Sequence, residues 1–159
     1  MKTTILHLFF SLTLISVSFA QSKSYQLLRE KFAGTENVIS LRTSGFMART
    51  ILWMAGENEF NDAIRNVRNV RLTVVPKAAF RKHDVTVKGF IKLAQKEGFE
   101  ELISARDHGD DVIILKQDLT AKKRDDRYLI LVDEGHEVVV MEVTGYVDTD
   151  ELLKHKNRI

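Results

Sequence analysis

The sequence predicts an α+β fold of two layers, with helices packed on one face of a mainly antiparallel sheet. Two observations predict this class. In the first half of the chain, stretches with apolar residues every three or four positions, typical of amphipathic helices, alternate with short extended runs. In the second half, four short apolar runs are separated only by turn sequences, which is the pattern of an antiparallel meander.

The first half contains both helical and extended patterns. Apolar spacing and terminating glycines predict three helices, over residues 24–33, 46–55 and 87–98. Extended segments are expected at residues 37–42 and 70–75, the second of which ends at the only proline, Pro76. The segment at residues 57–66 fits neither pattern clearly.

The four apolar runs of the second half predict strands at residues 102–106, 112–116, 128–132 and 138–143. A short helix is expected over residues 149–156. The last two strands carry apolar side chains at consecutive positions, although a strand with one wet face should alternate. We therefore expect the second face of the sheet to be an interaction surface, formed by Tyr128, Ile130, Val132, Val138 and Val140.

The first twenty residues predict a cleaved signal peptide. Lys2 gives a basic start, residues 5–17 are uncharged and largely apolar, and the small residues Ser18 and Ala20 suit cleavage after Ala20. The apolar stretch is too short for a comfortable membrane span. We expect residues 21–159 to form a single α+β domain, exported to the periplasm or secreted, with no membrane span once the signal is removed.

Composition argues against several classes of function. The chain has no cysteine, which excludes disulfides and thiolate sites, and its 24 basic and 22 acidic residues nearly balance. Such a balance does not indicate a nucleic-acid partner. The sequence also lacks a G-x-S-x-G turn, a phosphate loop and a dinucleotide fingerprint. We therefore expect no cofactor, assign no catalytic residues, and favour a protein that is not an enzyme.

Two loops hold the residues best suited to binding a cation. Asp107, His108, Asp110 and Asp111 lie in one predicted turn, and residues 133–137 (DEGHE) form another. Carboxylates and imidazole are ligands of divalent cations. Aspartate and glycine are also favoured in hairpin turns for backbone reasons, and the spacing is not that of a calcium loop, so solvated turns are the favoured interpretation.

Several short strings resemble those of the domain-of-unknown-function 4252 proteins, which are small exported proteins of Gram-negative bacteria. The strings lie at residues 31–34 (KFAG), 36–38 (ENV), 69–72 (NVRL), 99–102 (FEEL) and 145–148 (GYVD). The resemblance implies one exported α+β domain and brings no catalytic residues, because the family has no established activity. Many relatives look like lipoproteins, whereas Gln21 here follows the expected cleavage point in place of a cysteine.

These observations leave two functional hypotheses. In the first, the protein is a non-catalytic envelope module that binds a protein partner, or itself as a homo-oligomer, through the apolar second face. In the second, it binds a small molecule or a cation through the acidic and histidine loops, with an enzymatic role included.

Overall fold

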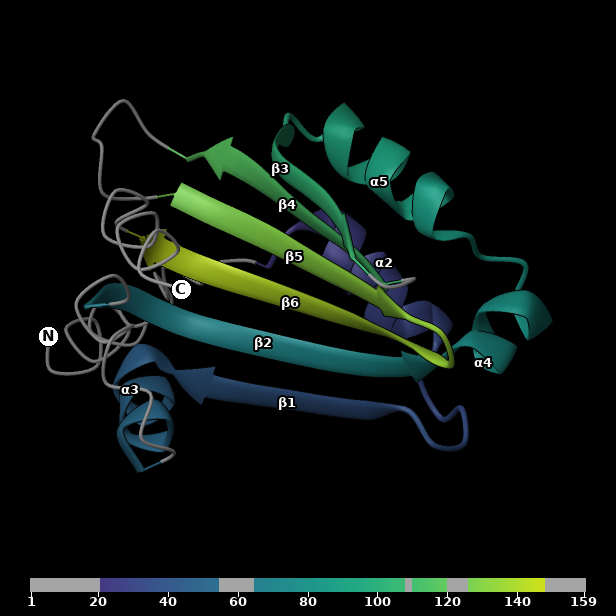
Figure 1. Ribbon diagram of the computed structural model, residues 1–159, viewed down its shortest axis with the longest axis horizontal. Helices are drawn as coiled ribbons and strands as arrows, with labels where there is room; N and C mark the ends of the chain where they lie inside the picture. The colour runs from purple at the N-terminus through teal and green to yellow at the C-terminus, as the bar shows by residue number, and fades with distance from the viewer. Residues whose placement is uncertain (1–20, 55–64, 108–109, 120–125, 148–159) are drawn as a thin grey trace, which may run out of the picture.

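The computed structural model describes residues 21–54, 65–107, 110–119 and 126–147. Six strands form one sheet in the order β1-β2-β6-β5-β4-β3, and every neighbouring pair is antiparallel (Figure 1). The strands are β1 (Ile39–Ser44), β2 (Asn66–Pro76), β3 (Glu100–Asp107), β4 (Asp110–Asp118), β5 (Asp126–Glu134) and β6 (Glu137–Tyr146). The predicted α+β class with a mainly antiparallel sheet is thus confirmed.

The helices are α2 (Lys23–Lys31), α3 (Gly45–Met54), α4 (Lys77–Lys82) and α5 (Val87–Lys96). Side-chain oxygens cap three of them: Ser22 accepts the N–H of Tyr25 at 3.2 Å, Ser44 accepts that of Met47 at 3.3 Å, and Thr86 accepts that of Gly89 at 3.0 Å. Three helices correspond to predicted ones. The sequence analysis missed α4, because six residues are too few to show a helical repeat, and the helix expected at residues 149–156 lies outside the described residues.

The strands differ from their predicted bounds mainly in length. All four predicted strands of the second half are present, and each extends further than predicted. Strand β1 begins two residues later than expected, and β2 begins at Asn66, well before the predicted start at Val70. The pairing of β2 with β6 shifts between Val67 and Asn69, and this bulge hides the beginning of β2 because it interrupts the alternation of side chains.

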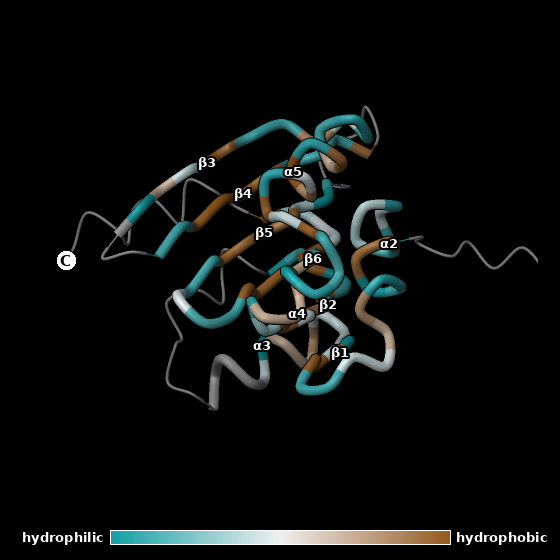
Figure 2. Tube along the Cα trace, turned by 90° about the vertical axis from the view of Figure 1, so that its right-hand side faces the viewer, coloured by the Kyte–Doolittle hydropathy of each residue, from teal (hydrophilic) through white to brown (hydrophobic). Residues whose placement is uncertain are grey.

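One buried cluster joins three helices to the sheet. Side chains from α2, α4 and α5 pack there against β2, β4, β5 and β6, and α2 and α5 lie on the same side of the sheet in both views (Figures 1 and 2). Helix α3 instead lies at one end of the sheet, beside β1 and β2. We call this the helix-side cluster; its buried members are Tyr25, Leu28, Phe32, Val75, Ala79, Phe80, Phe90, Ala94, Phe99, Leu115, Leu129, Leu131, Val138 and Val140.

A fully buried carboxylate lies beside the helix-side cluster. Glu142 of β6 is 0% exposed and accepts hydrogen bonds from the N–H and the hydroxyl of Ser22, at 2.7 and 2.6 Å. Arg71 of β2 donates to the same carboxylate at 2.5 Å, and Nε of Arg127 lies 3.8 Å from it. Burial lowers the pKa of Arg127. These contacts fix the start of α2 to the middle of the sheet.

A second set of hydrogen bonds supports this attachment. The hydroxyl and the N–H of Ser24 donate to Glu97, which follows α5, and the hydroxyls of Tyr25 and Thr73 are 2.9 Å apart. Helix α2 is therefore held to the sheet and to α5 through polar groups as well as through apolar packing.

Replacing Glu142 by Gln removes the negative charge that faces the buried Arg71 and the partly buried Arg127. Loss of one partner of a buried ion pair typically costs 3–5 kcal/mol, and we expect Glu142→Gln to lower the free energy of unfolding by about 3 kcal/mol. Urea denaturation followed by circular dichroism measures the change. Glu36→Gln is the control, because Glu36 is exposed and its loss should change stability little. Equal urea midpoints for the two variants would contradict the structural role of Glu142.

Candidate functional site

The face of the sheet opposite the helix-side cluster carries two complete rows of aliphatic side chains. The registers of all five strand pairs place one residue of each row on every strand, from β3 at one edge to β1 at the other. One row is Ile103, Ile114, Ile130, Met141, Leu72 and Leu41. The other is Ala105, Val112, Val132, Val139, Val74 and Ile39. We call these twelve residues the aliphatic face.

Part of the aliphatic face packs against other side chains of the sheet. Ile114, Ile130 and Met141 pack against a second buried cluster, formed by Val67, Tyr128 and Val143. Among the residues that the structure describes, no helix contributes to this cluster. The outer strands are the most open, with Ile39 54% exposed, Leu41 59% and Ile103 42%. Figure 2 shows β4 and β5 hydrophobic along their middle parts and hydrophilic at their ends.

Three of the five residues predicted for the interaction surface lie on this side, and two do not. Tyr128, Ile130 and Val132 share it, whereas Val138 and Val140 belong to the helix-side cluster and are 1% and 0% exposed. The cause is the register of the β5–β6 hairpin, in which Glu134 pairs with Glu137. A two-residue turn pairs even-numbered positions of β5 with odd-numbered positions of β6.

The residues of β6 that share the aliphatic side are therefore Val139, Met141 and Val143, the partners of Val132, Ile130 and Tyr128. The sequence analysis missed them, although the Gly135-His136 turn signal between two apolar runs contains the information needed to find them.

The two acidic loops come to the same end of the sheet. Asp111 of β4 pairs directly with Asp133 of β5, so the β3–β4 and β5–β6 turns are neighbours. Asp107 pairs with Asp110 across the first turn, and His108 lies outside the described residues. The structure thus brings the two predicted loops together at one end of the sheet. Among the described residues, the loop around Asp107 and Asp111 does not form a group of metal ligands.

Basic side chains already pair with both aspartates. Arg106 donates two hydrogen bonds to Asp111, at 2.5 and 2.9 Å, and lowers the pKa of that carboxyl. Nζ of Lys77 lies 2.5 Å from Asp133. Both carboxylates are thus held in ion pairs with basic side chains, which suits a structural role better than proton transfer.

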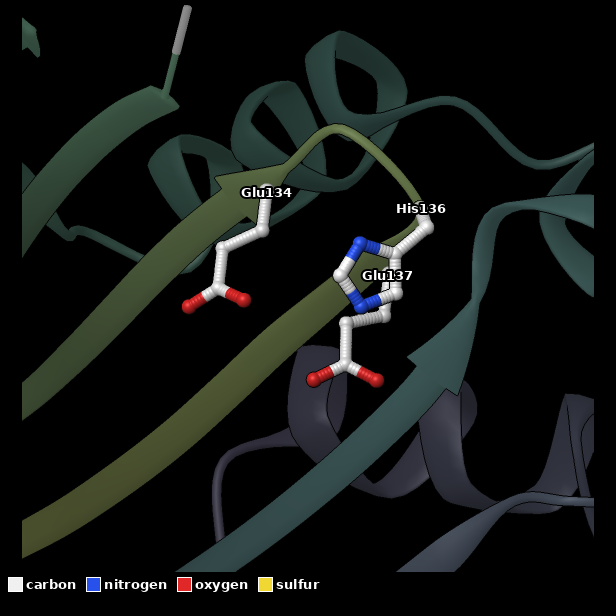
Figure 3. A group of neighbouring side chains, drawn as sticks. All are labelled: Glu134, His136 and Glu137. Carbon is white, nitrogen blue, oxygen red and sulfur yellow. The ribbon is translucent and has the colours of Figure 1, made fainter. Parts of the chain in front are cut away.

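Three other side chains of this end form the densest group of potential metal ligands in the described part of the chain. Glu134, His136 and Glu137 can bring their ligand atoms within 4.8 Å of one another, and all three side chains point to the same side of the β5–β6 hairpin (Figure 3). The N–H of Lys77 donates to the carbonyl of His136 at 2.9 Å, which anchors the turn to the end of β2. An imidazole and two carboxylates are a ligand set for Zn²⁺ or Mn²⁺.

A cavity of about 500 Å³ opens beside the same end, between α5 and strands β3 to β5. Its floor is apolar, formed by residues such as Val87, Ile91, Ile113 and Leu131, and its rim carries Lys88, Arg106, Asp111 and Asp133. The volume falls in the range of small-molecule sites. Asp111 and Asp133 are paired with Arg106 and Lys77, so the rim residues that the structure describes include no unpaired carboxylate.

The opposite end of the aliphatic side carries an ion cluster around a buried tyrosine. Nζ of Lys116 lies 2.8 Å from Asp118 and 3.3 Å from Asp126, and the hydroxyl of Tyr128 donates to Asp126 at 3.2 Å. Burial is the largest cause that raises the pKa of Tyr128 to about 12, and the charge of Asp126 adds to it. The phenol is thus held in its neutral form beside the carboxyl group of Asp126.

A six-stranded antiparallel sheet with an aliphatic face and charged ends defines a small α+β protein. The chain belongs to the family described as a domain of unknown function, DUF4252, whose sequence pattern matches residues 32–154. The suspected family is therefore confirmed. No curated protein and no solved structure matches the chain. None of the helices in the described part of the chain has the length and apolar character needed to cross a membrane.

The raised pKa of Tyr128 predicts a loss of stability in alkaline solution. An unfolded tyrosine ionises near pH 10, whereas folded Tyr128 ionises at about 12. Unfolding therefore releases a proton between these pH values. The contribution of Tyr128 to the free energy of unfolding is complete below pH 10 and falls as the pH rises toward 12. Urea denaturation across this range should show a steeper loss of stability in the wild type than in Tyr128→Phe. Parallel curves would contradict the buried neutral phenol.

Proposed function

We propose that this protein is a non-catalytic, exported module that binds protein through the aliphatic face. In this proposal, α2, α4 and α5 cover one face of the sheet and leave the other for association. The observation that carries it is the pair of uninterrupted aliphatic rows across all six strands.

The chemistry of this face supports association rather than catalysis. Aliphatic side chains cannot transfer protons, act as nucleophiles or bind metal ions, but they gain free energy when they leave water. Soluble monomers seldom expose continuous apolar patches of more than a few hundred Å², and larger patches mark sites of interaction. An antiparallel sheet can keep one face in water, but such a face is normally polar.

Neighbouring residues of β5 test the proposal, because Ile130 lies on the aliphatic face and Leu131 lies in the helix-side cluster. We expect Ile130→Asp to keep the fold while removing association, measured by light scattering of the purified chain and by cross-linking in the cells that export it. Leu131→Asp should abolish folding, since it places a charge in the core.

Lys92→Asp, on the exposed side of α5, is the matched surface control and should leave both folding and association unchanged. Association that survives in folded Ile130→Asp would reject this face as the binding surface.

The second candidate function is binding of a cation or small molecule at the acidic end of the sheet. The observation that favours it is the grouping of Glu134, His136 and Glu137 at the β5–β6 turn. Two carboxylates and an imidazole leave coordination positions open for water or for a ligand. The site would hold its ion at the end of a rigid hairpin.

Titration with Zn²⁺ and Ca²⁺ tests this candidate through the melting temperature. A ligand that binds only the folded chain stabilises it by mass action, by about 2.7 kcal/mol at one hundred times its dissociation constant. We expect Zn²⁺ to raise the melting temperature of the wild type but not that of His136→Ala. His83→Ala is the control for chance binding to histidine, because His83 lies elsewhere, against Thr35. If Zn²⁺ leaves the melting temperature of the wild type unchanged, metal binding at this site is rejected.

A further inference from the structure

The cavity under α5 extends to the hydrophobic core on the helix side of the sheet. Val87 and Ile91 line it from α5, and Ile113 and Leu131 line it from β4 and β5. Leu131 is 1% exposed and belongs to the helix-side cluster, so the inner part of the cavity is apolar. The volume of about 500 Å³ suits an aliphatic chain, which gains free energy when it leaves water.

The charged groups at the rim leave one cation without a partner. Asp111 accepts two hydrogen bonds from Arg106, and Asp133 forms an ion pair with Lys77. Lys88, in the first turn of α5, has no carboxylate partner among the described residues. Counted together with Lys77, the rim therefore carries a single positive charge in excess, which favours an anionic ligand over a neutral or cationic one.

We propose that the cavity binds a small monocarboxylate with an aliphatic chain, of the fatty-acid type. Its carboxylate pairs with Lys88 at the rim, and its chain packs against Ile113 and Leu131 inside. One carboxylate neutralises the excess charge of the rim, whereas the two charges of a phosphate monoester would exceed it.

Neighbouring donors can complete the binding of the carboxylate. Arg106 uses only two of its five N–H donors on Asp111, and its side chain is 77% exposed. Ser104 of β3 also lines the cavity and carries a hydroxyl. A carboxylate has two oxygens, so one can accept from Lys88 while the other accepts from one of these donors.

This site is separate from the β5–β6 turn and from the aliphatic face. None of Glu134, His136 and Glu137 lines the cavity, and the aliphatic face lies on the side of the sheet away from α5. The inference therefore goes beyond the proposed functions. It names a ligand opposite in charge to a metal ion, and it stands whether or not the aliphatic face binds a protein.

Octanoate is a suitable probe, because it combines one carboxylate with an aliphatic chain at neutral pH. Isothermal titration calorimetry of the purified protein measures its affinity. Octanol serves as the uncharged ligand of equal chain length, and acetate serves as the carboxylate without the chain. We expect octanoate to bind more tightly than octanol, and acetate to show no measurable binding.

Two lysines of α5 form a matched pair of variants. Lys88 lines the cavity, whereas Lys92 is exposed one turn further along and does not line it. Lys88→Glu turns an attraction into a repulsion, so we expect about tenfold weaker binding of octanoate and unchanged binding of octanol. Lys92→Glu makes the same change in net charge and should alter neither affinity.

A cavity-filling variant locates the ligand. Ser104 is exposed on the edge strand β3 and lines the cavity. Ser104→Phe should fill the space and abolish binding of both octanoate and octanol, with the circular dichroism spectrum unchanged. Ile130→Asp, on the aliphatic face, should leave octanoate binding intact, which separates this site from the proposed protein-binding surface.

The same measurements can overturn the proposal. A folded wild type that fails to bind millimolar octanoate rejects the ligand class, and octanol that binds as tightly as octanoate rejects the role of the charge. Equal octanoate affinities of Lys88→Glu and Lys92→Glu reject Lys88 as the anchor. Binding that is lost in Ile130→Asp but kept in folded Ser104→Phe places the ligand on the aliphatic face. If Ser104→Phe does not fold, the two lysine variants still decide, because both residues are exposed.

Discussion

The carboxylate of Glu142 connects segments that lie far apart in the sequence, and the arrangement of the two faces depends on it. It accepts two hydrogen bonds from Ser22 at the start of α2 and one from Arg71 of β2. A buried charge is tolerated only where it is paired and fully hydrogen-bonded. Because Ser22 supplies two of these bonds, α2 has a fixed place on this side of the sheet, and the aliphatic face lies on the other side.

The aliphatic face differs from the helix-side face in the kind of partner it can accept. Opposite α2, the sheet presents Arg71, Thr73 and Glu142, which require polar partners in defined places. The two rows of the aliphatic face contain no polar side chain that needs a hydrogen-bonding partner, and charged groups lie only at the ends of this face. Apolar contact supplies free energy without direction, so the two aliphatic rows do not by themselves fix the orientation of a partner.

Local sequence patterns were sufficient to predict which segments are helices or strands, and roughly where most of them lie, because alternation and helical spacing are local properties. They failed where the structure depends on a single residue: the bulge near Val67 hid the start of β2, and a register error of one position assigned Val138 and Val140 to the wrong face. The approach of Asp111 to Asp133 depends on strand order, and the contact between Ser22 and Glu142 spans 120 residues, beyond any local pattern. Helix α4 was too short to show a repeat.

The central position of β6 has a consequence for the order of events during synthesis. Strands β1 and β2 form one half of the sheet and β5, β4 and β3 the other, and β6 alone joins them. It is also the last strand of the described residues, and it carries the carboxylate that binds Ser22 near their beginning. Contacts between such distant segments form late, because a long loop must close before they gain anything. The two halves of the sheet therefore stay separate until β6 has been synthesised, and only then can the sheet become continuous.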